Sequence, residues 1–215
     1  MSGFVIAVDG PAASGKGTIA HRLGADFGLP VLDSGLLYRA VGVMLLADGG
    51  DLADEVAAAE VARRLDPARL DDPAFRRREA GEAASRVAAY ASVRVALHDF
   101  QRAFAAQPGG AVIDGRDIGT VIAPDAPAKL YVTASPEARA RRRWLQLEDT
   151  GAPYDEVLAD ILRRDARDAG RAEAPMRPAN DAVLLDTTEM TIPAAADAAR
   201  RIVEAARARW DSSRR

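Results

Sequence analysis

The chain has 215 residues, of which 48% are apolar and 28% charged, a composition that suits one globular domain with a sizeable core. The net charge of −3 excludes a global field that attracts nucleic acid or membranes, and the lack of cysteine excludes disulfides and thiolate metal sites. No apolar run approaches the ~20 residues of a membrane span, and the first strand starts too early for a signal peptide. We expect a cytoplasmic protein that works as a monomer, with neither a membrane nor a nucleic-acid polymer as partner.

Short apolar runs predict five strands, and the segments between them have helical periodicity. The strands are expected at residues 4–8, 30–32, 111–113, 129–133 and 182–185. Helices are expected at residues 16–27, from about 34, and over about 73–89, 93–106, 136–148, 154–169 and 192–209, with a frayed tail at 212–215. This alternation indicates an α/β fold, a parallel five-stranded sheet with helices on both faces.

The segment GPAASGKGT, residues 10–18, follows the first strand and opens the first helix. Its glycine spacing is that of a phosphate-binding loop (P-loop), in which backbone N–H groups point inward at phosphate oxygens. The helix N-terminus favours anions, and Lys16 would place an ammonium on the outer phosphates. The candidate donor contacts in this loop are Gly10, Ala13, Ser14, Gly15, Lys16, Gly17 and Thr18.

A glycine-rich turn can also be only a tight connection, but composition favours phosphate binding. The chain has 29 basic residues and only two of them are lysines, Lys16 and Lys129. Lysine has thus been kept where a compact point charge is wanted. The hydroxyl comes one position later than usual, at Thr18, and this GKGT form is associated with nucleoside-monophosphate kinases.

Polar residues also follow the second and third strands, where ligands of open parallel sheets bind. Ser34 and Arg39 come after the second strand, although a helix N-cap and a solvated surface charge would equally explain them. Asp114 ends the third strand, a common place for a carboxylate that holds water on Mg²⁺. A turn alone would not require the Arg116-Asp117 pair that comes next.

The segment RRDARDAGRAEAP, residues 163–175, places arginines at 164, 167 and 171 on one helical stripe if the helix continues to its end. An exposed helix with i,i+3 and i,i+4 ion pairs is one interpretation. The other is a mobile lid that closes on phosphates between glycine and proline hinges. Arg139 and Arg142, in an arginine-rich helix, are candidate contacts to a donor nucleotide, with a solvated helix face as the alternative.

Together these segments resemble bacterial cytidylate kinases over nearly the whole chain and in the family's order. The resemblance is carried by GPAASGKGT, LDSGLLYR, AASRVAAYASVR (83–94), DGRDIGTVIAPDAPAKLYVTAS (114–135) and RRDARDAGRAEAP. It implies transfer of the γ-phosphoryl group of ATP to CMP or dCMP, which gives ADP and CDP or dCDP. The segment after Leu65 is shorter here than in longer members, whose acceptor-binding insertion carries a small antiparallel sheet.

The resemblance also implies roles for individual residues. Ser34, Arg39 and Arg116 would engage the acceptor nucleotide, chiefly its phosphate. Ser85, Arg94 and Asp117 would read the base, and Arg164, Asp168 and Arg171 would hold the sugar and phosphate from a lid. It divides the chain into a core (1–33, 95–148 and 179–215), an acceptor-binding insertion (about 34–94) and a lid (about 149–178).

The chemistry of cytosine agrees with these roles. The carboxylate of Asp117 can accept from the 4-amino group, while Arg94 and Ser85 can donate to the ring acceptors. Uracil would present a carbonyl oxygen to the same carboxylate, and such a mismatch costs about 1–3 kcal/mol or more. Cytosine is therefore the expected base.

The expected mechanism is phosphoryl transfer by positioning and charge neutralisation, without a covalent intermediate. Mg²⁺ is the expected cofactor, ligated by Thr18 and assisted through water by Asp114 or Asp33. The residues expected to stabilise the transferring group are Lys16, Arg39, Arg116, Arg164 and Arg171.

Two other functions are compatible with a phosphate-binding loop. One is a kinase for UMP, AMP or another small acceptor. The other is a regulatory nucleotide-binding module without turnover, such as a GTP-dependent switch. A guanine reader of the N-K-x-D type is excluded, since the only asparagine, Asn180, precedes Asp181.

Overall fold

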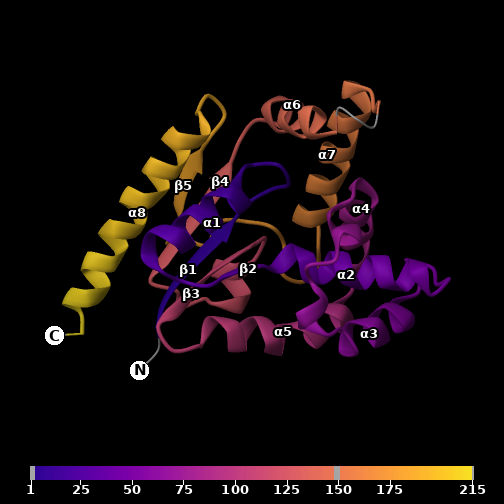
Figure 1. Ribbon diagram of the computed structural model, residues 1–215, viewed down its shortest axis with the longest axis horizontal. Coiled ribbons are helices and arrows are strands. Elements are labelled where there is room, and N and C mark those ends of the chain that lie inside the picture. The colour runs from indigo at the N-terminus through magenta and orange to yellow at the C-terminus, as the bar shows by residue number, and fades with distance from the viewer. Residues whose placement is uncertain (1–2, 148–150, 215) are drawn as a thin grey trace. The chain divides into compact units, whose positions relative to one another are not determined.

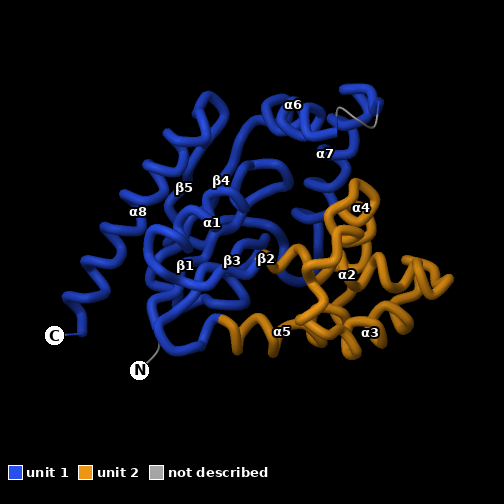
Figure 2. The backbone as a smooth tube through the Cα atoms, viewed as in Figure 1, with its two compact units in different colours: residues 1–32, 105–215 blue, residues 33–104 orange. Residues whose placement is uncertain are grey.

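The computed structural model describes residues 3–147 and 151–214 of the chain. Within this part, backbone contacts divide the chain into two compact units, drawn in blue and orange in Figure 2. The first unit comprises residues 1–32 and 105–215, and the second comprises residues 33–104. The predicted division into core, insertion and lid stays a prediction. Figure 1 labels the elements that are named below.

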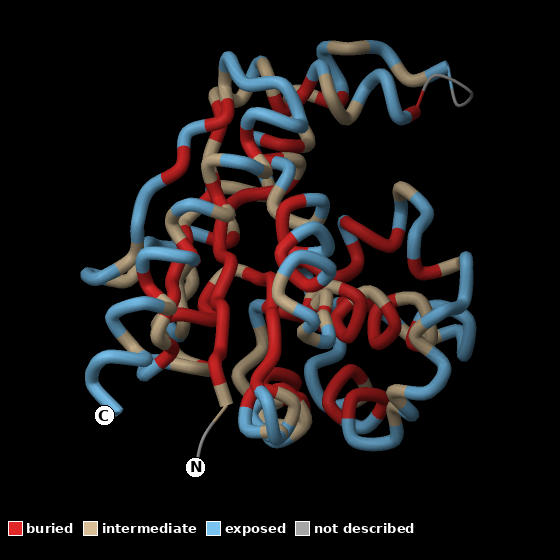
Figure 3. The backbone as a smooth tube through the Cα atoms, turned by 60° about the vertical axis from the view of Figure 1, so that its left-hand side comes forward, coloured by how far each residue is buried: buried red, intermediate tan, exposed pale blue. Residues whose placement is uncertain are grey.

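A five-stranded sheet, with the strand order β2-β3-β1-β4-β5, forms the centre of the fold. Its strands are β1 (Phe4–Asp9), β2 (Val31–Asp33), β3 (Gly110–Gly115), β4 (Ala128–Thr133) and β5 (Val183–Asp186). The β1–β3, β1–β4 and β4–β5 pairs are parallel, as expected for strands that follow one another through helices. The central strand β1 and its neighbour β3 are buried along their whole length (Figure 3), which explains their apolar runs.

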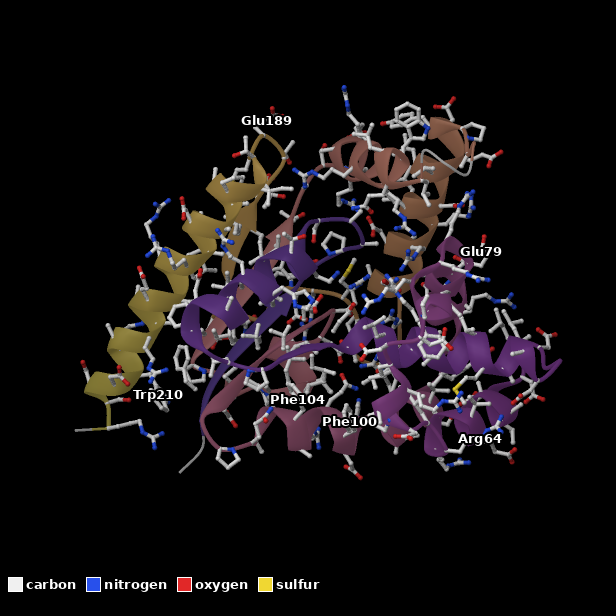
Figure 4. The ribbon with its side chains drawn as sticks, in the orientation of Figure 1. Arg64, Glu79, Phe100, Phe104, Glu189 and Trp210 are labelled. Carbon is white, nitrogen blue, oxygen red and sulfur yellow. The ribbon has the colours of Figure 1, made fainter. Side chains whose placement is uncertain are left out.

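The described residues of the first unit form four α-helices: α1 (Lys16–Phe27), α6 (Pro136–Gln146), α7 (Tyr154–Ala169) and α8 (Ile192–Ser212). Helices α1 and α8 contribute Leu23 and Val203 to the main core, where they pack with β1, β3 and β4. Trp210 of α8, labelled in Figure 4, meets the ring of Phe4 edge-on, with a centroid distance of 5.4 Å. Helix α6 packs against α7.

Sequence signals explain where these helices begin and end. The side chain of Ser135 caps α6 at the N–H of Ala138, and Thr191 caps α8 in the same way. Helix α1 ends at Gly28, whose φ of +64° is the left-handed conformation that a helix C-cap requires.

The second unit is built from helices: α2 (Ser34–Ala47), α3 (Glu55–Arg63), α4 (Arg78–Val87) and α5 (Ala91–Ala105), with short 3₁₀ turns at Pro67–Arg69 and Pro73–Arg76. Its core contains Leu37, Val41 and Val87. Helices α2 and α4 approach so closely at Gly42 that a Cβ atom there would lie 2.7 Å from the Cβ of Ala83. Glycine is therefore required at this crossing.

The fold class is confirmed, and the five strands lie where the sequence predicts, with ends shifted by at most two residues. Helices α1 and α7 have the predicted bounds. The single helix predicted at residues 73–89 is wrong, because Arg77 is extended (φ −65°, ψ 164°) and separates a 3₁₀ turn from α4. The fray predicted from residue 212 is also wrong at its start, since α8 includes Ser212.

Neither helix α3 nor the π-helical turn at Ile118–Ile122 was predicted from the sequence. The predicted helix end at 148, the first two residues of the predicted lid and residue 215 lie outside the described residues. Within the described residues, no helix is both long enough and apolar enough to span a membrane.

Candidate functional site: a phosphate loop and a charged turn

The loop between β1 and α1 has the backbone of an anion cradle. Gly10 has φ +148°, and a Cβ atom there would lie 2.0 Å from the carbonyl oxygen of Val132. Gly15 has φ +88° at the N-cap of α1, and Ala13 adopts φ +59°, a conformation uncommon outside glycine. Because Gly15 has no side chain, the first N–H groups of α1 face outward without a side-chain cap, as an anion site requires.

A pocket of about 300 Å³ opens over this loop. Its lining comprises Ala13, Ser14, Gly15, Lys16, Gly17, Thr18, Ile19, Arg142, Gln146, Thr187, Met190, Thr191, Ile192 and Ala195. Arg142 is held at the wall by Thr187, whose hydroxyl accepts from Nη1 at 3.0 Å. The same hydroxyl lies 3.1 Å from the carbonyl oxygen of Ser14. The structure thus brings Arg142 to the phosphate loop.

Arg139 occupies a different environment, buried behind the loop with 3% of its surface exposed. Its Nε donates to the carbonyl of Ala134 at 2.9 Å and its Nη1 to the carbonyl of Ala12 at 3.3 Å. Its Nη2 lies 2.6 Å from a carboxylate oxygen of Asp165 on α7. These bonds brace the phosphate loop against α6 and α7, while a contact from Arg139 to a donor nucleotide stays a prediction.

Replacement of Arg139 by methionine is expected to lower the free energy of unfolding by about 3 kcal/mol, because two carbonyls and the Asp165 carboxylate lose their donor. Urea unfolding followed by circular dichroism measures this loss. Arg141→Met is the control, since Arg141 is exposed on the same helix. Equal stability of the Arg139 and Arg141 variants would contradict the bracing role.

Asp114 is the penultimate residue of β3, beside the phosphate loop. The carboxylate is buried, and a Cβ atom at Gly17 would lie 3.8 Å from its Oδ2. Thr18 is exposed and lies in the first turn of α1. Within the described residues, no three His, Cys, Asp or Glu side chains form a metal-binding group. Mg²⁺ that binds through substrate phosphates needs only one or two protein ligands, so Asp114 and Thr18 fit such an ion. Asp33 lies in the second unit, at the N-cap of α2.

Asp9, at the end of β1, was given no role by the sequence analysis. Its carboxylate, 4% exposed, accepts hydrogen bonds from the N–H groups of Ile118 at 2.8 Å and Gly119 at 2.7 Å. Burial raises the pKa of Asp9 from 3.8 to about 7, although these two bonds oppose the shift. The sequence offered one signal for a role of Asp9. It places a carboxylate at the end of a buried strand, and burying a carboxylate costs free energy unless the group has a partner.

This raised pKa predicts how stability depends on pH. Between about pH 4 and pH 7 the unfolded chain has lost the Asp9 proton and the folded chain retains it. Through Asp9, the free energy of unfolding therefore falls by about 1 kcal/mol for each unit that the pH rises in this range. The advantage of the parent over Asp9→Asn is therefore expected to be larger at pH 5 than at pH 8. Urea unfolding at both pH values tests this, and an equal difference at the two would contradict it.

Three predicted residues meet where the turn after β3 approaches the end of α7. The Nε of Arg116 lies 3.1 Å from Oδ2 of Asp168, and its Nη1 donates to the carbonyl of Gly115. The other oxygen of Asp168 accepts from Arg171. Asp168 is only 2% exposed, so the exposed-helix interpretation is wrong for this residue. Helix α7 ends at Ala169, so Arg171 lies beyond the predicted helical stripe, whereas Arg164 is within the helix and half-buried.

The remaining candidates belong to the second unit. Ser34, Ser85 and Arg94 are buried, and the guanidinium of Arg94 lies 5.9 Å from the ring centroid of Tyr38. The N-cap interpretation of Ser34 is wrong, because Asp33 holds the N-cap position of α2 and Ser34 is its first residue. Arg39 is half-buried rather than a fully solvated charge.

Sequence comparisons identify close relatives along almost the entire chain. A model of the cytidylate kinase family matches residues 6–207. A cytidylate kinase of Caulobacter vibrioides (strain NA1000 / CB15N) is 66% identical over 209 residues, which cover 96% of this chain and 98% of that protein. A cytidylate kinase of Rhodopseudomonas palustris (strain ATCC BAA-98 / CGA009) is 57% identical over 207 residues, with 95% and 98% covered.

Solved structures share the fold at much lower identity. A protein of Eubacterium ventriosum ATCC 27560 superposes with a TM-score of 0.56 at 14% identity, covering 94% of this chain and 98% of its own. A sugar kinase from Janibacter sp. HTCC2649 superposes with a TM-score of 0.51 at 15% identity, with 94% and 95% covered. At these identities the likeness shows the fold alone.

Proposed function

Because the chain belongs to the cytidylate kinase family, it is an enzyme that transfers the γ-phosphoryl group of ATP to CMP or dCMP, and we propose which of its residues carry out the transfer. The observation that supports the assignment best is the phosphate loop itself. Gly15 with its left-handed backbone, the uncapped start of α1 and Lys16 all line one pocket, and the carboxylate of Asp114 is buried near Gly17.

For the donor, we propose that the N–H groups of Gly10 and of residues 13–18, together with the ammonium of Lys16, bind the phosphates of ATP. The apolar part of the pocket, with Met190 and Ile192, then accommodates the adenosine, and Arg142 lines the same pocket. Arg139 contributes by holding the loop in shape. Lys16 neutralises charge on the transferring group, where a compact ammonium is effective.

Mg²⁺ is the proposed cofactor, held by the hydroxyl of Thr18 and, through water, by Asp114, with Asp33 as the other candidate carboxylate. When bound, it neutralises charge on the phosphates of the donor. We expect EDTA to stop ADP release and added Mg²⁺ to restore it. ADP release that continues at the same rate in EDTA would contradict the metal assignment.

For the acceptor, we propose that Arg116, Arg164 and Arg171 bind the CMP phosphate and that Asp168 binds the sugar. Asp117 accepts from the cytosine amino group. We propose the same phosphate role for Ser34 and Arg39, and a role in reading the base for Ser85 and Arg94. The burial of Asp117, Ser85 and Arg94 supports these roles, since charged and polar side chains in the interior have specific partners.

The arrangement needs no general base, because the attacking oxygen belongs to a phosphate that is already an anion. It displaces ADP from the γ-phosphorus in line, while Lys16 and the arginines stabilise the charge on the equatorial oxygens. We further propose that the protein works as a monomer in the cytoplasm, without a nucleic-acid polymer as partner. The net charge of −3 and the absence of cysteine support this setting.

The acceptor is tested by measuring ADP release from ATP–Mg²⁺ with CMP, dCMP, UMP, AMP and GMP. CMP and dCMP are expected to be used with the highest kcat/KM. A kinase for UMP or AMP, the other candidate on the same core, predicts the reverse order. Preference for UMP or AMP over CMP would contradict the assignment of Asp117.

A further inference from the structure

Asp9 joins two segments that the proposed function uses separately. It is the last residue of β1, and the phosphate loop begins at the next residue, Gly10. Its two carboxylate oxygens accept from the N–H groups of Ile118 and Gly119, which directly follow Arg116 and Asp117. One side chain thus connects the donor loop to the turn that carries two of the proposed acceptor contacts.

These two bonds hold the turn at a defined place. Both are short, 2.8 and 2.7 Å, both involve a carboxylate, and both lie out of contact with water, so each is of the strong charge-assisted kind. They engage consecutive residues at the start of the π-helical turn, so neither N–H group can shift without breaking a bond. The backbone at Asp117, with φ −145° and ψ 23°, leads directly into this anchored pair.

The opposite side of the turn is supported as well. A Cβ atom at Gly119 would lie 3.3 Å from Oδ2 of Asp9 and 3.2 Å from Cδ of Lys129. The ammonium of Lys129 is held by both oxygens of Asp181, at 2.9 and 2.8 Å, and by the carbonyl of Pro124. A methyl group at Gly119 would therefore require Asp9 and the stem of Lys129 to move by a few tenths of an ångström.

We propose that Asp9 is a positioning residue that fixes the Arg116–Gly119 turn relative to the phosphate loop, so that cytosine discrimination and phosphate alignment depend on a side chain that touches no substrate. The proposal rests on the roles proposed above for Arg116 and Asp117. It predicts that loss of the Asp9 carboxylate weakens the use of CMP much more than the binding of ATP.

Ionisation of Asp9 bears on the strength of this anchor, because a protonated carboxyl keeps one good acceptor and turns the other oxygen into a hydroxyl. The groups that face Asp9 are Arg116 and Asp117 from the turn and Tyr131 from β4, with Lys129 beyond Gly119. Because burial disfavours the ionised form, it raises the pKa of Asp9 to about 7. The two hydrogen bonds from Ile118 and Gly119 are therefore strongest above neutral pH, where the carboxylate is ionised, even though burial of that charge lowers the stability of the fold there.

The test is Asp9→Asn, which keeps the shape but points an N–H₂ group at one of the two N–H donors. The expected result at pH 8 is a fall of about tenfold in kcat/KM for CMP and of about fivefold in the CMP-to-UMP ratio, with KM for ATP changed by less than about twofold. Asp197→Asn, an exposed carboxylate on α8, is the matched control and should behave as the parent. A fall in ATP use as large as the fall in CMP use would overturn the proposal.

The pH profile gives an independent readout. In the parent, kcat/KM for CMP is expected to rise through about pH 7, and this component should be absent from Asp9→Asn. The phosphates of the substrates titrate equally in both proteins, so only the difference between the profiles counts. Profiles that coincide after scaling would contradict the role of the Asp9 carboxylate.

Two further variants separate the possible failures. If Asp9→Asn does not fold, Gly119→Ala, which pushes a methyl against Asp9 and Lys129, must show the same selective loss of CMP use for the proposal to stand. Asp117→Asn is measured in parallel. If it leaves the CMP-to-UMP ratio unchanged, the proposed base contact is wrong. If it lowers the ratio and neither Asp9→Asn nor Gly119→Ala does, the positioning role of Asp9 alone is wrong.

Discussion

Lys16→Ala is expected to lower kcat for CMP phosphorylation by about 10³-fold or more, the largest effect of any substitution considered. Lys16 stands at the first position of α1, directly after the left-handed Gly15, and its side chain lines the pocket over the loop. The γ-phosphoryl group carries its charge on oxygens that only preorganised cations and N–H groups can stabilise. Steady-state kinetics with saturating ATP–Mg²⁺ and CMP measure the loss.

Lys16→Arg is the informative companion of this variant. A guanidinium keeps the charge but is planar and larger than an ammonium, so it is expected to restore only a small part of the lost rate. The unfolding midpoint of Lys16→Ala should stay close to that of the parent, because Lys16 is only half-buried. Turnover near the parental level in Lys16→Ala would contradict the whole donor site.

Asp117→Asn is expected to change the choice of base. In the proposed site the buried carboxylate of Asp117 accepts from the 4-amino group of cytosine, whereas an amide at the same place could donate to the O4 atom of uracil. The CMP-to-UMP ratio of kcat/KM is therefore expected to fall by about 10–100-fold, mainly through loss of CMP use. Initial rates with each acceptor at several concentrations measure the ratio.

The control for base reading lies at an exposed aspartate of the same region. Asp125 follows the π-helical turn and faces solvent, so Asp125→Asn should keep the parental ratio. An Asp117→Asn variant that still discriminates as strongly as the parent would place the base reader elsewhere in the chain.

Much of the fold was predictable because its signals are local. Strands β1 and β3 are buried throughout and therefore appear as apolar runs, and Gly28 and Ser135 mark helix ends by their conformational and capping preferences. Helix α3 was missed although Asp54 caps it at the N–H of Ala57, because it is only nine residues long and the face that it buries is mostly alanine. The break at Arg77 has no glycine or proline to announce it.

The candidate site was predictable only where a motif carries it. The loop from Gly10 to Thr18 has a spacing that the chemistry of phosphate imposes, so the sequence predicts it directly. Asp9 was missed because its partners are backbone N–H groups 109 and 110 residues away, which no side-chain pattern records. The bonds from Arg139 to the carbonyls of Ala12 and Ala134 could not be predicted for the same reason, and its contact to a donor nucleotide stays a prediction.

The central claim is that this chain moves the γ-phosphoryl group of ATP to the phosphate of CMP. The most direct measurement supplies ATP labelled at its γ-phosphorus, with Mg²⁺ and equal concentrations of CMP and UMP, and follows the label into separated products. The claim predicts that the label appears in CDP well before UDP and hardly at all in inorganic phosphate, and that Lys16→Ala abolishes its transfer. Label that accumulates in UDP or in inorganic phosphate instead would contradict it.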